Sequence, residues 1–249
     1  MVSVFRLWNL QATFFFKNEI MNRNLLSLLF FIISLSAFSQ NYQVIYKTEV
    51  NIDNLKNIKD PIIKNNVESK LKAKRSHRFQ LLVAGDKAVY SFYEQMLPEG
   101  IQLPKVERFY YKGNQVVAER EGVFVKYDLN HHQWTITDDS VTINGYVCYR
   151  AFTKRPHLIE ALGDEEQEME AWFCPDFPVK YGPEDFFGLP GLVLVARTKG
   201  ATSSLVVEKI IPLKSAPQLK FPKIDKTLTP EEYKFFVNKE VNEFLEKLK

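Results

Sequence analysis

The chain has 249 residues, of which 45% are hydrophobic, 14% aromatic and 25% charged. This composition supports a buried core and excludes a disordered tail or a coiled coil. The 33 Lys and Arg residues against 30 Asp and Glu give a net charge of +3, and 30 against 29 remain when residues 1–39 are left out. Such a nearly neutral chain gives no case for nucleic acid or an anionic membrane surface as a partner.

Residues 21–39 have the parts of a secretory signal peptide in their usual order. Met21-Asn22-Arg23-Asn24 is a short basic start, residues 25–38 are apolar apart from serines, and Ala37-Phe38-Ser39 offers small residues to a signal peptidase. The apolar run is shorter than the roughly 20 residues that span a bilayer. The sequence therefore predicts export, with no transmembrane segment.

Two consequences follow for the ends of the expressed protein. A signal peptide normally has its basic start at the initiator methionine, so we expect translation to begin at Met21 and residues 1–20 to be untranslated; a long, atypical leader is the alternative. Cleavage after Ser39 exposes Gln40 and no cysteine, so no lipid anchor is expected. The mature protein is predicted in the periplasm, at the outer membrane or outside the cell.

The mature chain opens with a predicted strand at 42–47 and a predicted helix after Asp60-Pro61, an N-cap followed by proline at the first helical position. Ile63, Val67 and Leu71 recur every four residues along that helix. Lysines and an arginine at 70–75 suit the negative end of the helix dipole, and we favour a solvated helix end over a basic binding patch there.

From Phe79 onward, apolar and polar residues alternate, and turn signals such as Gly85-Asp86 and Lys112-Gly113-Asn114 recur every eight to twelve residues. This spacing is typical of an antiparallel sheet whose successive strands are neighbours. About ten strands are expected, from the segments 79–84, 87–93, 108–111, 115–118, 123–127, 133–137, 141–154, 166–173, 192–197 and 203–211.

The fold class predicted is mainly β: a single curved antiparallel sheet, half-barrel or barrel, with a short N-terminal helix and a C-terminal helix. The β domain is placed at 40–212, and 213–249 is a connector with an amphipathic helix. That helix opens with the capping box Thr229-Pro230-Glu231-Glu232. Its apolar face, which is expected to dock, carries Phe235, Phe236, Val237, Val241, Phe244 and Leu245. Aromatic residues are expected to fill the core, with a ligand cavity as the alternative.

Two cysteines in an exported chain suggest a disulfide. If the strands around Cys148 and Cys174 pair residues whose numbers sum to 322, the cysteines face each other, and Lys154 lies opposite Glu168. Opposed residues on paired strands are close enough for a disulfide. A cross-strand bridge is thus the candidate, and two reduced thiols are the alternative.

No catalytic, cofactor or metal site is predicted. His131 and His132 are adjacent, so a strand would point them to opposite faces, and no ligand of zinc-like spacing accompanies them. No Gly-x-Ser-x-Gly, phosphate loop or dinucleotide fingerprint is present. Carboxylates crowd one hairpin and are interpreted as a solvated acidic loop: Glu160, Asp164, Glu165, Glu166, Glu168 and Glu170.

The most unusual segment carries paired glycines around Leu189-Pro190, which permit a tight backbone reversal before an apolar strand. The hexapeptide 188–193 resembles that of the GLPGLI family of Bacteroidota envelope proteins, with Val193 in place of isoleucine. The upstream segments 145–148 and 171–173 also match the pattern of this family. The hairpin between them looks longer than is usual in the family. The residues that carry the motif are Gly182, Pro183, Phe187, Gly188, Leu189, Pro190, Gly191, Leu192 and Val193.

The resemblance implies an exported β-rich protein of unknown activity, without catalytic residues. Because members are commonly encoded near TonB-dependent outer-membrane transporters, it also implies an accessory role in the envelope. The first hypothesis is therefore a non-enzymatic module that binds a partner protein or an apolar ligand, with the segment 182–191 as a rigid corner. The second is a secreted hydrolase whose carboxylate pair is assembled by folding.

Overall fold

The computed structural model describes residues 41–51, 59–93, 107–159 and 166–247. The chain divides into two units, Met1–Gln40 and Asn41–Lys249, and every described residue lies in the second. The predicted signal peptide and the segment 1–20 before it therefore lie outside the described residues. Among the described residues, no helix is long and apolar enough to cross a membrane.

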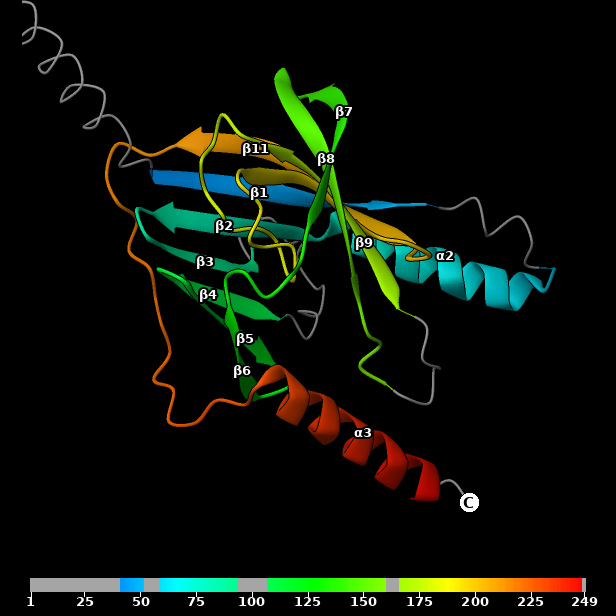
Figure 1. Ribbon diagram of the computed structural model, residues 1–249. Coiled ribbons are helices and arrows are strands. Elements are labelled where there is room, and N and C mark those ends of the chain that lie inside the picture. Colours follow the sequence, from blue (N-terminus) through cyan, green and yellow to red (C-terminus); the bar gives the residue numbers. More distant parts are fainter. Residues whose placement is uncertain (1–40, 52–58, 94–106, 160–165, 248–249) are drawn as a thin grey trace, which may run out of the picture. The chain divides into compact units, whose positions relative to one another are not determined.

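The described chain is mainly β, as predicted, with eleven strands in one antiparallel sheet (Figure 1). The strands are β1 (Asn41–Val50), β2 (Arg78–Ala84), β3 (Lys87–Phe92), β4 (Arg108–Lys112), β5 (Gln115–Arg120), β6 (Val123–Asp128), β7 (Thr135–Ile143), β8 (Tyr146–Arg155), β9 (Gln167–Cys174), β10 (Leu192–Thr198) and β11 (Ser203–Pro212).

The order across the sheet is β6-β5-β4-β3-β2-β1-β11-β10-β9-β8-β7. Strands that follow one another in the chain are neighbours in the sheet, except β6 and β7, which form its two edges. At the centre, the first strand β1 pairs with β2 on one side and with the last strand β11 on the other. No ladder joins β6 to β7 within the described residues, so the sheet is not a closed barrel.

Within the described residues two helices accompany the sheet, and both begin at the caps predicted from the sequence. Helix α2 (Pro61–Ser76) is capped by the Asp60 carboxylate, which accepts from the backbone amides of Ile62 at 2.8 Å and Ile63 at 3.1 Å. Helix α3 (Pro230–Lys247) starts with the reciprocal Thr229 and Glu232 bonds of a capping box, at 2.8 and 3.2 Å.

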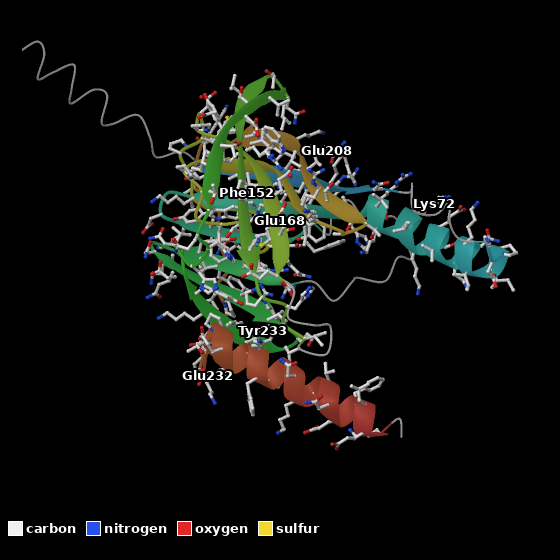
Figure 2. The ribbon with its side chains drawn as sticks, turned by 45° about the vertical axis from the view of Figure 1, so that its right-hand side comes forward. Lys72, Phe152, Glu168, Glu208, Glu232 and Tyr233 are labelled. Atoms are coloured by element: carbon white, nitrogen blue, oxygen red, sulfur yellow. The ribbon has the colours of Figure 1, made fainter. Side chains whose placement is uncertain are left out.

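The predicted docking of α3 is observed for its first turns. Tyr233 in the first turn is buried, and Phe236 and Val237 are half-buried against the core. Two other members of the predicted apolar face stay exposed: Phe235 beside them is 74% exposed, and Phe244 near the far end is 60% exposed. Figure 2 shows Tyr233 and Glu232 at the end of α3 that lies next to the sheet. Only this end has a partner surface within the described residues.

The prediction of one strand over 141–154 is also wrong. Asn144 and Gly145, with φ of 53° and 85°, form a tight turn that separates β7 from β8. Both central residues of a type I′ hairpin turn need positive φ, and Asn-Gly is the preferred pair. Strand β7 instead joins the predicted segment 133–137 to the start of 141–154 across an irregularity between Ile136 and Ser140.

The predicted register of β8 and β9 is confirmed. Tyr149 lies opposite Phe173 and Lys154 opposite Glu168, and both pairs sum to 322. The next pair in this register is Cys148 with Cys174, both fully buried and both free thiols. Burial is the main cause that raises the pKa of the Cys148 thiol to about 12, and the neighbouring Cys174 contributes to the same shift. The disulfide itself stays a prediction.

Candidate functional site

The segment 177–191 between β9 and β10 lies on the inner face of the sheet, and we call it the plug. Its residues Phe187 and Leu189 are fully buried. The Tyr111 hydroxyl on β4 donates to the Gly182 carbonyl at 2.8 Å, and the Trp134 indole N–H donates to the Phe187 carbonyl at 2.8 Å. The plug therefore fills the inner face with the chain's own side chains.

Three glycines of the family-like motif are required for the plug to fit. A Cβ at Gly182 would lie 1.7 Å from the Phe186 carbonyl oxygen, and one at Gly191 would lie 2.4 Å from that of Cys174. Gly188 has φ of +90°, and its Cβ would meet the Leu129 oxygen at 2.4 Å. Backbone contact accounts for these glycines, which agrees with the interpretation of the segment as a rigid corner.

The plug also carries a charge into the core. The two carboxylate oxygens of Asp185 each accept from a different arginine, Oδ1 from Arg120 on β5 and Oδ2 from Arg155 on β8. We call these three residues the clamp. In a flat sheet, β5 and β8 would be eight strand spacings apart, about 38 Å. Because both reach one carboxylate, the sheet must be strongly curved, and the clamp ties its two ends together.

Arg120 is enclosed more tightly than its partner. Its side chain is 4% exposed, against 28% for Arg155. Its guanidinium carbon lies 5.3 Å from the ring centre of Phe109 and 5.8 Å from those of Tyr127 and Tyr233. Such aromatic faces stabilise a desolvated cation, but the main compensation is the adjacent carboxylate.

Asp185 and the neighbouring His132 both have lowered pKa values, but for different reasons. Burial alone would raise the pKa of Asp185, but Arg120 and Arg155 outweigh it and lower the pKa to about 2. Burial lowers the pKa of His132 to about 4, and the two arginines add to this effect. His132 is therefore neutral at pH 7.

Glu184, the neighbour of Asp185, behaves differently. Burial, assisted by Glu107 and Asp185, raises its pKa to about 7. The residue has φ of 50°, an uncommon conformation for a side chain other than glycine. It lines a second cavity of about 220 Å³ together with Lys74, His77 and residues of β10 and β11. The two adjacent carboxylates thus face different cavities.

The clamp forms one wall of a cavity of about 210 Å³, the clamp cavity. Its other walls come from β6, the β6–β7 connection, the end of β8 and the first turns of α3. It is lined by Arg120, Tyr127, His131, His132, Arg155, Pro156, His157, Leu158, Asp185, Pro230, Glu231 and Lys234. This is the candidate site because buried charge, histidines and apolar walls meet there.

The histidine pair considered as a metal ligand lies in this cavity. The ring centres of His131 and His132 are 5.0 Å apart, and His132 packs against Phe187 at 4.8 Å. Within the part of the chain that the structure describes, no three His, Cys, Asp or Glu side chains gather as a metal site. Of the acidic hairpin residues, Glu160, Asp164 and Glu165 lie outside the described residues.

Sequence reasoning missed the clamp. One local signal was present for Arg120, since Val116 and Ala118 are buried and Arg120 occupies the next inward position of β5. An arginine at a core position requires a buried partner. That Asp185 supplies it is a tertiary result, because 65 residues separate the two.

Comparisons with known proteins agree with a β-rich protein of unknown activity. A family model described as "Protein of unknown function (Porph_ging)" matches residues 159–195, which include all of β9, the plug and the start of β10. This match is consistent with a Bacteroidota family. No curated protein matches the chain.

Among solved structures, PNGF-II in a C2 crystal form is similar with 17% identity and a TM-score of 0.50, over 80% of this chain and 32% of PNGF-II. The chain thus spans about a third of that protein's length, and the likeness shows the fold alone. The Mycobacterium tuberculosis lipoprotein LppX aligns over 76% of this chain and 92% of its own, with 9% identity and a TM-score of 0.26.

Proposed function

We propose that this protein is an exported, non-enzymatic binding module of the cell envelope and a member of the GLPGLI family. The observation that carries the proposal is the buried plug. The motif residues serve backbone geometry and core packing, which leaves the clamp cavity, with its mixed polar and apolar walls, as the place for a ligand.

The side chains near this cavity favour binding over covalent catalysis. Among the described residues that form its walls there is no serine or cysteine. Asp185 is held ionised between two arginines, so it is a poor general base at neutral pH. Both cysteine thiols are buried, with raised pKa values, and so are weak nucleophiles.

Export is tested by expressing the chain from Met21 in a Bacteroidota host and fractionating the cells. We expect a mature N-terminus at Gln40 in the periplasmic or outer-membrane fraction. A cytoplasmic product that retains residues 21–39 would contradict export.

The finer proposal is that the protein accompanies a TonB-dependent outer-membrane transporter. In-cell cross-linking of a C-terminally tagged protein, followed by mass spectrometry, should recover such a transporter as the main partner. The matched control is a tagged periplasmic protein at equal abundance. Equal recovery of transporters with both baits would contradict the association.

A hydrolase is the second candidate, favoured by the divergent pKa values of three carboxyl groups. Asp185 is held ionised, whereas burial raises the pKa of Glu184 to about 7 and that of Glu107 above its usual value. Groups with such separated pKa values are typical of acid and base pairs. This candidate requires that the protein hydrolyse at least one substrate in a panel of chromogenic esters, glycosides and peptides, and that E184Q abolish the activity.

A further inference from the structure

Helix α2 leaves most of its apolar stripe uncovered. All of its 16 residues are described, and Leu71 is the only one that is buried. Ile63, at the other end of the stripe, is 53% exposed, and Ile62 beside it is 71% exposed. Figure 1 shows that α2 extends away from the sheet, with its first turn farthest out. Because a helix of this length gains most of its stability from packing, the first two turns lack a surface that their apolar residues could use.

The rows of side chains beside this stripe are basic. Residues four apart form rows along a helix, which places Lys70 and Lys74 on one side of the stripe and Lys64 and Lys72 on the other. Figure 2 labels Lys72 on α2. The helix carries five cations and one carboxylate: Lys64, Lys70, Lys72, Lys74, Arg75 and Glu68. Within the part of the chain that the structure describes, none of these six residues forms an ion pair, although Arg75 donates to the Val50 carbonyl at 3.4 Å.

The charge of the chain is therefore unevenly distributed. From residue 40 onward the chain holds 30 cations and 29 carboxylates, and 25 against 28 remain when α2 is left out. The nearly neutral total thus combines a helix of charge +4 with a remainder of charge −3. Such a separation of charge turns α2 toward an anionic surface, which the net charge of the whole chain does not reveal.

The arrangement of charge favours a lipid surface as the occupant of this face. A second copy of the chain would bring two helices of charge +4 together, and these would repel each other. The cations lie on both sides of the stripe, so the anionic groups must also extend on both sides of the helix. A membrane surface meets this requirement, because its headgroups surround an inserted apolar stripe while the long lysine side chains reach up to the phosphates.

We propose that α2 lies on an anionic phospholipid surface and anchors the protein there. Ile62, Ile63 and Val67 enter the boundary between headgroups and acyl chains, and the lysines contact the phosphates. The positive charge at 70–75 suits a solvated helix end if the apolar stripe is packed within the protein; because the stripe is exposed, a lipid surface accounts for both features. This inference goes beyond the proposed function, since it concerns α2 and not the clamp cavity.

The test is co-sedimentation of the mature protein with vesicles of two compositions, pure phosphatidylcholine and an equimolar mixture of phosphatidylcholine and phosphatidylglycerol. We expect the partition coefficient to be at least about tenfold higher for the anionic vesicles, because several cations each contribute to the attraction. Binding should weaken as salt rises from about 0.1 M to about 1 M, where screening is much stronger. Equal partition into the two kinds of vesicle would overturn the proposal.

A pair of lysine variants shows whether the attraction belongs to α2. K70Q/K72Q should lower the partition coefficient by about 25-fold, at about fivefold for each cation removed. The matched control K87Q/K112Q removes two exposed cations from β3 and β4, with the same change in net charge, and should bind as wild type does. If the two double variants weaken binding equally, the attraction is a property of the whole chain and the assignment to α2 is wrong.

The apolar part of the proposal has a test of its own. I62S/I63S should lower the partition coefficient at least about fivefold, because two side chains no longer leave water for the membrane. The control I136S/V141S alters two exposed residues of β7 and should leave binding unchanged. Full binding by I62S/I63S would show that charge alone holds the protein and would refute insertion of the stripe. Circular dichroism and melting curves establish that each variant is folded.

An acidic protein is the other occupant that the charge of α2 could accept, and polyglutamate is the probe for it. Retention of the mature protein on immobilised polyglutamate, without binding to the anionic vesicles, would assign α2 to an acidic protein and overturn the lipid proposal. Failure to bind vesicles leaves the proposed envelope role intact, since that role is tested by fractionation. A cytoplasmic product in the fractionation would contradict export and leave the measured lipid affinity of α2 unaffected.

Discussion

The clamp predicts a large and specific loss of stability when its carboxylate is removed. In D185N, Arg120 and Arg155 lose their shared counter-charge, and Arg120 keeps its charge at 4% exposure. Removing one partner of a buried ion pair costs about 3–5 kcal/mol because it leaves an uncompensated buried charge. The lowered pKa of Asp185, about 2 against an ordinary 3.8, is independently worth about 2–3 kcal/mol.

The assay is urea unfolding of the mature protein, followed by tryptophan fluorescence. With a urea m-value of about 1–3 kcal/mol/M, a loss of about 3 kcal/mol lowers the unfolding midpoint by about 1–3 M. The matched control is E168Q, which removes an ion pair of Glu168 with Lys199 at 3.3 Å, where the lysine is 75% exposed. Exposed pairs contribute about 0–1 kcal/mol, so this variant should unfold close to wild type.

The pH dependence provides a second check on the clamp. A carboxyl group whose pKa is lowered by folding stabilises the protein fully above its unfolded pKa, and this contribution disappears as pH falls through the folded pKa. The wild type should therefore lose the Asp185 contribution between about pH 4 and pH 2, a loss that D185N lacks. Ordinary surface substitutions change the free energy of unfolding by up to about 0.5 kcal/mol. If D185N differs from wild type by no more than this at pH 7, the clamp does not hold the sheet ends together.

Three further predictions concern the plug and the thiols. G188A should destabilise the protein by more than about 2 kcal/mol, because its Cβ would meet a backbone oxygen at 2.4 Å. The control G200A has a φ of +80° but open space around it, so it should cost only about 1 kcal/mol in the same urea assay. Because the pKa of Glu184 is raised by folding, stability should fall as pH rises from about 4.5 to 7, and E184Q should flatten that slope in urea titrations; an unchanged slope would contradict the shift. Protein isolated from the envelope should show a disulfide between Cys148 and Cys174 in non-reducing mass spectrometry, and the double C148S/C174S variant should be less stable by about 2–4 kcal/mol; two free thiols would refute the bridge.

The sequence alone determined most features that depend on neighbours along the chain. The Asp60 cap of α2 and the capping box of α3 were readable because each involves residues two or three positions apart. The register of β8 and β9 followed from alternation and charge pairing across one hairpin. The Asn144-Gly145 hairpin was equally local and was missed, although its turn signal is strong.

Only the tertiary structure decided the site. Asp185 lies 65 residues from Arg120 and 30 from Arg155, and their meeting depends on how far eleven strands curve around the plug. Curvature accumulates from small twists at each strand pair, which no single segment encodes. The exposure of the outer half of α3 is also decided by the tertiary structure. An amphipathic pattern shows that one face of a helix is apolar, but it does not show whether another surface lies close enough to cover that face.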